Sequence, residues 1–87
     1  MVVYVLSRYW DTPSNEGNEV MGVYQNKEDA VFDMREDVAI AKKYYSYDFW
    51  EEDMTWEDEC EIHLGCNQSG CNLATIYAWK IDEMEVQ

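Results

Sequence analysis

Apolar residues between Lys27 and Tyr45 recur at spacings of three and four, and this pattern constrains the fold more than any other in the chain. The positions are Ala30, Val31, Met34, Val38, Ala41 and Tyr45. Because an α-helix turns about every 3.6 residues, these side chains form one apolar face, which packs against a sheet. Asn26 can cap the start of the helix, with Asp29 three residues later as in a capping box. We therefore predict one amphipathic helix over residues 27–45.

Segments with β-strand character precede this helix. Residues 2–10 (VVYVLSRYW) and 19–25 (EVMGVYQ) are rich in β-branched and aromatic side chains. Residues 11–18 contain Pro13 and Gly17 among small polar residues, which favours a loop. The pattern predicts an antiparallel strand pair joined by that long loop.

A second pair of strands follows the helix. Residues 58–66 alternate with a period of two, which puts the set Cys60, Ile62, Leu64 and Cys66 on one face and Glu61 and His63 on the other. Residues 67–70 (NQSG) indicate a turn, and residues 72–81 return as a strand. A four-residue turn gives the register Cys66–Cys71, Leu64–Leu73 and Ile62–Thr75.

The order strand, strand, helix, strand, strand is typical of an α+β domain. We predict a four-stranded antiparallel sheet (β-β-α-β-β) covered by one main amphipathic helix, in a single domain spanning residues 1–87. An acidic, aromatic segment over residues 47–61 lies between the helix and the third strand, and its secondary structure from 44 to 57 is not predicted. Residues 82–87 are expected to be a frayed acidic tail.

Charge limits the partners of this domain. The chain has nineteen Asp and Glu residues against six Lys and Arg, a formal net charge of −13. Direct binding to nucleic acid or to an anionic membrane would begin with repulsion. A basic protein surface would instead be attracted over a long range, so we expect a partner of that kind.

The acids concentrate in one stretch, which we take as the candidate partner-binding site. It combines carboxylates without a neighbouring basic residue and aromatic side chains of the kind that anchor interfaces. The predicted binding residues are Asp48, Trp50, Glu51, Glu52, Asp53, Trp56, Glu57, Asp58, Glu59 and Glu61. Asp11, Glu16 and Glu19 are candidates to extend the surface. The alternative is a solvated acidic loop that only aids solubility.

A zinc site is the main alternative chemistry. Four residues of zinc-binding type have the spacing C-x2-H-x2-C-x4-C, namely Cys60, His63, Cys66 and Cys71. The strand alternation argues against convergence, because it places Cys60 and His63 on opposite faces. A further alternative is that Cys66 and Cys71 form a disulfide across the hairpin on oxidation.

Motifs for catalysis are not found. The chain has a single histidine, no G-x-S-x-G serine and no glycine-rich phosphate loop, so we expect no enzyme and no cofactor. No D-x-D-x-D-G calcium loop is present either. Three cysteines and no visible signal peptide favour a cytoplasmic protein. From the size of the domain we expect a monomer or a small homo-oligomer.

Two resemblances accompany these patterns. Val3-Tyr4-Val5-Leu6, Gly22-Val23-Tyr24 and Glu28-Asp29-Ala30 resemble small bacterial and phage domains in which a strand pair runs into a helix, and this implies a fold only. The short, acidic chain without catalytic motifs also resembles phage-encoded DNA mimics, including anti-CRISPR and anti-restriction proteins. That resemblance implies inhibition of a host defence nuclease by occupation of its nucleic-acid channel. The expected target is a CRISPR effector or another host defence enzyme, in the cytoplasm of the host cell if the protein is phage-encoded. The competing hypotheses are a zinc-stabilised module with incidental acidity and a regulatory partner unrelated to nucleic acid.

Overall fold

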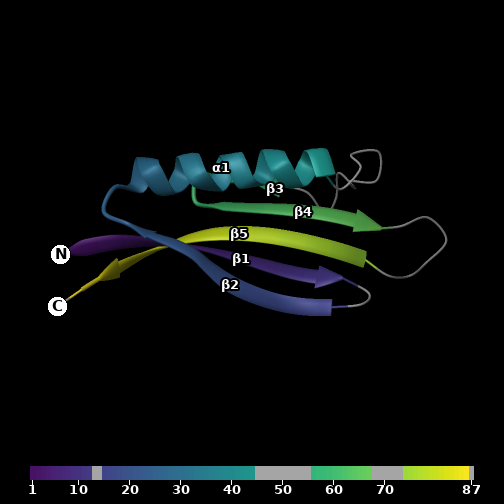
Figure 1. Ribbon diagram of the computed structural model, residues 1–87, viewed down its shortest axis with the longest axis horizontal. Helices are drawn as coiled ribbons and strands as arrows, with labels where there is room; N and C mark the ends of the chain where they lie inside the picture. The colour runs from purple at the N-terminus through teal and green to yellow at the C-terminus, as the bar shows by residue number, and fades with distance from the viewer. Residues whose placement is uncertain (13–14, 45–55, 68–73, 87) are drawn as a thin grey trace.

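One helix lies along one face of an antiparallel sheet (Figure 1). The computed structural model describes residues 1–12, 15–44, 56–67 and 74–86. Within them the elements are β1 (Val2–Thr12), β2 (Asn15–Tyr24), α1 (Lys27–Tyr44), β3 (Trp56–Glu57), β4 (Glu61–Asn67) and β5 (Ala74–Glu85).

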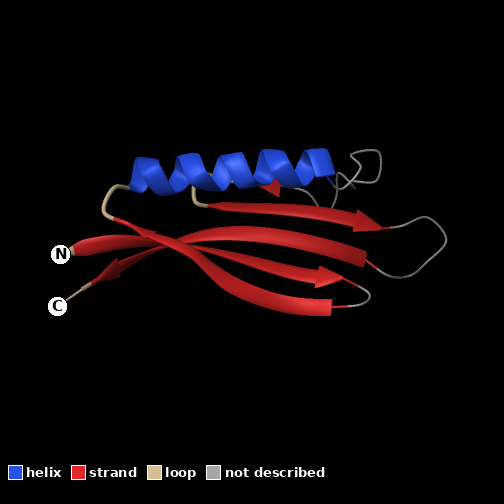
Figure 2. Ribbon diagram, in the orientation of Figure 1, coloured by secondary structure: helices blue, strands red, loops and turns tan. Residues whose placement is uncertain are grey.

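The strands are ordered β2-β1-β5-β4-β3, and each neighbouring pair is antiparallel. In the part of the chain that the structure describes, the sheet and one helix form two layers, and no helix or strand covers the second face of the sheet (Figure 2). The molecule is elongated, with principal extents of 50 × 20 × 20 Å. The predicted α+β fold with β-β-α-β-β order and one helix is confirmed, and β3 adds a two-residue strand at the edge of the sheet.

The helix was predicted correctly as far as Tyr44 because its apolar stripe is strong, and Tyr45 lies outside the described residues. Ala30, Met34, Val38 and Ala41 are buried, and Val31 is partly buried against the same core. The sheet supplies the other buried members, Leu6, Ile62, Leu64, Trp79 and Ile81. Removing each large apolar side chain from water contributes about 1.5–3 kcal/mol, so this stripe holds the two layers together.

The predicted loop over residues 11–18 is wrong. β1 continues to Thr12 and β2 begins at Asn15, with Thr12 opposite Asn15. Gly17 lies opposite Trp10, and a Cβ atom at Gly17 would come within 2.5 Å of the Trp10 ring. The glycine is therefore needed in the strand because the indole covers its backbone, and it does not signal a turn.

The predicted register of the second hairpin is also wrong. Leu64 lies opposite Tyr77 and Ile62 opposite Trp79, a shift of four residues from the expected pairing. An even shift leaves every side chain on the same face, so the period-two pattern identifies the face and not the register. Cys66 lies opposite Thr75 and not Cys71, which is outside the described residues.

The expected frayed tail at residues 82–87 is instead ordered through residue 86. β5 runs to Glu85, which lies opposite Val2. The Val86 N–H donates to the Met1 carbonyl at 2.7 Å. The tail pairs because β1 begins at Val2 and offers backbone partners for it, whatever the charge of its side chains.

Candidate partner-binding surface

The predicted binding residues are only partly within the described structure. Trp56 and Glu57 form β3, Asp58 and Glu59 lie in the connection that follows, and Glu61 is the first residue of β4. The remaining five lie outside the described residues: Asp48, Trp50, Glu51, Glu52 and Asp53.

Two of the described acids have cationic partners on α1, contrary to the expectation of an unopposed stretch. Oε1 of Glu57 lies 3.0 Å from Lys42 Nζ, and its Oε2 lies 3.9 Å from Arg35 Nη1. Glu59 lies 2.9 Å from Lys27, and this hydrogen bond is the main reason that the pKa of Lys27 is raised. These cations are distant in sequence, so only the packing of α1 beside β3 and β4 brings them to the acids.

Asp58 and Glu61 have no Lys or Arg partner within the described part of the chain. Asp58 Oδ1 accepts from the Glu59 N–H at 2.7 Å, and the Asp58 N–H donates to the Glu61 carbonyl at 2.7 Å. Glu61 Oε1 lies 3.4 Å from Nε2 of His63. The described part of the predicted surface therefore contains two acids held in ion pairs with Lys or Arg and two that are not.

Over all described residues, acids without a Lys or Arg partner outnumber paired acids more strongly than they do in this stretch. All six Lys and Arg residues are described, and all but Lys43 are in ion pairs within the described part of the chain. Of nineteen acids, four are outside the described residues and five pair with Lys or Arg (Glu19, Asp37, Glu57, Glu59 and Asp82). Ten described carboxylates are left without a Lys or Arg partner: Asp11, Glu16, Glu28, Asp29, Asp33, Glu36, Asp58, Glu61, Glu83 and Glu85.

Several of these unpaired acids have local structural roles. Glu28 and Asp29 occupy the first turn of α1, where negative charge complements the helix dipole. The Asn26 side-chain amide donates to the Asp29 carboxylate at 3.4 Å. This contact joins two side chains and differs from a capping box, in which each side chain bonds to the other residue's backbone N–H. Asp11 and Glu16 lie opposite each other in the first hairpin, a like-charged pair with an energetic cost.

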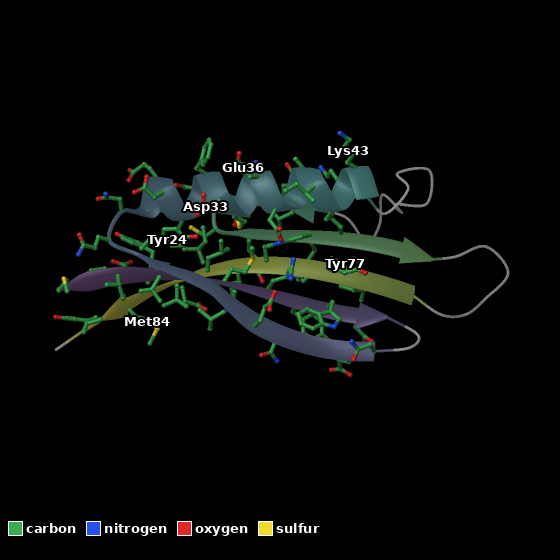
Figure 3. The ribbon with its side chains drawn as sticks, viewed as in Figure 1. Tyr24, Asp33, Glu36, Lys43, Tyr77 and Met84 are labelled. Atoms are coloured by element: carbon green, nitrogen blue, oxygen red, sulfur yellow. The ribbon has the colours of Figure 1, made fainter. Side chains whose placement is uncertain are left out.

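Two carboxylates that sequence reasoning missed connect the helix to the sheet. Asp33 accepts a hydrogen bond of 2.6 Å from the Tyr24 hydroxyl, and Figure 3 shows these two side chains meeting between α1 and β2. Asp37, four residues later, accepts from the Trp79 indole at 2.7 Å. Their spacing beside the apolar stripe was the available signal, because it places both at the margin of the buried face.

Arg8 makes several contacts with side chains of the described residues. It donates to Asp37 at 3.1 Å and forms a second, short ion pair with Glu19. Its guanidinium also lies 5.7 Å from the centre of the Trp10 ring, within the range of a cation–π interaction. Glu19 was a candidate to extend the binding surface, and this pairing makes it a poorer one than Asp11 or Glu16.

The uncovered sheet face has a shallow depression of about 310 Å³, whose lining includes Ser7, Tyr9, Asn18, Glu61, His63 and Lys80. Cys60, in contrast, packs against the core on the helix side. Cys60 and His63 therefore do not converge, as the alternation predicted. The Cys66 side chain and Cys71 are outside the described part, within which no group of three potential metal ligands occurs.

No helix in the described part of the chain combines the length and apolar character needed to cross a lipid bilayer. Comparison with protein-family models, curated proteins and solved structures finds no match for this chain.

Proposed function

We propose that this protein binds the basic nucleic-acid-binding surface of another protein and blocks it by placing carboxylates where phosphates would lie. The target class is a host defence nuclease, first of all a CRISPR effector, and the protein acts in the cytoplasm of the host cell. The observation that carries the proposal is the charge balance described above. Five of the six basic side chains are engaged in internal ion pairs, while ten described carboxylates have no such partner.

Shape and charge density support this proposal. Dividing the 50 Å long axis by the net charge of −13 gives about one net negative charge per 4 Å. A single nucleic-acid strand carries about one charge per 3.4 Å and a duplex about one per 1.7 Å. The protein is therefore comparable to a single strand in axial charge density. Its 20 × 20 Å cross-section is close to the width of a duplex.

Aromatic residues distinguish the proposed contact from a purely electrostatic one. Trp50 and Trp56 lie among the acids of residues 47–61 in sequence and would supply the apolar anchors of the interface. Asp48, Glu51, Glu52 and Asp53 would replace phosphates, together with Asp58 and Glu61. Glu57 and Glu59 contribute less in this proposal, because Lys42, Arg35 and Lys27 already offset their charge.

The test measures binding to purified CRISPR effector nucleases with and without their nucleic acid. We expect nucleic acid to compete with the protein and the Kd to weaken at least about tenfold when salt rises from about 0.05 to 0.2 M. The paired substitutions Glu51→Lys and Glu52→Lys should abolish binding. The matched control, Glu28→Lys with Glu36→Lys, makes the same charge change on α1 and should retain most of it. Simultaneous binding of nucleic acid and protein would refute the proposal, and equal losses in both variants would show that the surface is elsewhere.

A further inference from the structure

The last residues of β5 form an open sheet edge. β4 begins at Glu61, which lies opposite Lys80, so beyond Ile81 the described chain places no strand on that side of β5. β1 still pairs with the other side, as far as Glu85. In Figure 1 this end of β5 (yellow) extends past the start of β4 (green).

Hydrogen-bond directions identify which backbone groups face the open side. The Ile81 N–H donates to the Cys60 carbonyl, toward β4, and the Val86 N–H donates to the Met1 carbonyl, toward β1. In an antiparallel strand these directions alternate from residue to residue. Glu83 and Glu85 have the same parity as Ile81, so their N–H and C=O groups face outward and can pair with another strand.

The side chains along this edge differ between the two faces. Glu83 and Glu85 are exposed on the helix side, in line with the buried Ile81. Within the described residues neither is in an ion pair with Lys or Arg. Met84 and Val86 are 52% and 45% exposed on the other face. A second copy of this chain is a poor occupant, because its acids would face these acids.

We propose that residues 82–85 of β5 accept an extended basic segment of the partner as an additional strand. The segment would alternate Lys or Arg, beside Glu83 and Glu85, with apolar residues beside Met84 and Val86. Backbone hydrogen bonds would give affinity and the alternation would give specificity, as in other cases of strand addition. This inference rests on the proposed function, since it specifies one element of the basic partner.

The first test uses the wild-type chain and two peptides of identical composition. One is Lys-Val-Lys-Val-Lys-Val and the other is Lys-Lys-Lys-Val-Val-Val. We expect the alternating peptide to bind about tenfold more tightly. It should also slow hydrogen exchange at the Glu83 and Glu85 amides, measured by NMR. Binding without slower exchange at these amides would overturn the proposal of strand addition at this edge. The proposed function, binding to a basic partner, would still stand. If neither peptide nor polylysine binds at low salt, both the edge proposal and the proposed function are refuted.

The second test is a proline substitution that acts on the edge alone. The Glu83 N–H faces outward, so Glu83→Pro removes no bond to β1 and is compatible with an edge strand. Glu83→Gln is the matched control, because it removes the charge and keeps the N–H. We expect Glu83→Pro to weaken binding of the alternating peptide about tenfold. Glu83→Gln should weaken it about threefold or less. Equal affinities of the two variants would contradict the proposal.

Discussion

The indole N–H of Trp79 donates a hydrogen bond of 2.7 Å to Oδ2 of Asp37, and the same oxygen accepts from Arg8 at 3.1 Å. Trp79 is 1% exposed, so water does not readily replace this acceptor. One carboxylate of α1 is thereby joined to β5 and to β1. The contact links the two layers at a point where the apolar core alone would leave a polar group unsatisfied.

Asp37→Ala should lower the free energy of unfolding by about 2 kcal/mol, because it leaves the Trp79 N–H and the Arg8 guanidinium without this acceptor. Urea denaturation measures the change. Glu36→Ala is the matched control on the same helix, and we expect it to stay within about 0.5 kcal/mol because that side chain is exposed. Equal stabilities of the two variants would show that the Asp37 contacts contribute little.

Stability should fall with rising pH between about 10 and 12 because of Tyr24. Its hydrogen bond to Asp33, with burial and nearby carboxylates, raises the pKa of Tyr24 from 10.0 to about 12. The folded state then holds the phenolic proton where the unfolded state has lost it, so this stabilisation is complete below pH 10 and is lost as the pH rises to 12. Urea midpoints across this range should fall less steeply for Tyr24→Phe. Parallel curves for the two proteins would contradict the assignment.

Asp11→Lys should stabilise the protein by about 0.5 kcal/mol, because it replaces a like-charged pair with an ion pair to Glu16 across the first hairpin. Thermal unfolding monitored by circular dichroism measures the shift. Glu28→Lys changes the charge equally but places a cation in the first turn of α1, so it should destabilise. Stabilisation by both variants would mean that relief of net charge, not the specific pair, is responsible.

Met34→Ala should cost about 2–5 kcal/mol, because Met34 is fully buried between α1 and the sheet. Ile40→Ala on the same helix should change stability by less than about 0.5 kcal/mol, since Ile40 is 63% exposed. Denaturant titration of both variants provides the comparison. A comparable loss at Ile40 would reveal a contact that involves the outer face of α1.

Element type was predictable here and pairing detail was not. The stripe from Ala30 to Ala41 and the alternation from Cys60 to Leu64 each report a local period, so they identify a helix and a strand. Register depends on which of several pairings with the same side-chain faces packs best in the core. The observed register places Trp79 opposite Ile62. Gly17 was wrongly taken as part of a loop for a related reason. It is needed because Trp10 on the neighbouring strand lies against its backbone, and the local sequence does not show this contact.

The charges of the candidate surface were predictable in number but not in pairing. The sequence shows that Glu57 and Glu59 have no basic neighbour along the chain. It does not show that α1 places Lys42 and Lys27 within 3.0 and 2.9 Å of them. Asp33 and Asp37 were missed likewise, because a carboxylate beside an apolar stripe becomes a structural acceptor only when the sheet supplies a donor.

The two hydrogen bonds between Met1 and Val86 have a practical consequence for how the protein is handled. An affinity tag or a fused reporter at either terminus would emerge beside the open edge of β5 and could cover it. Joining the two termini with a short linker and reopening the chain within another connection would move the tag to the far end of the molecule. A circular permutant of this kind is the better form for attaching the protein to a sensor surface.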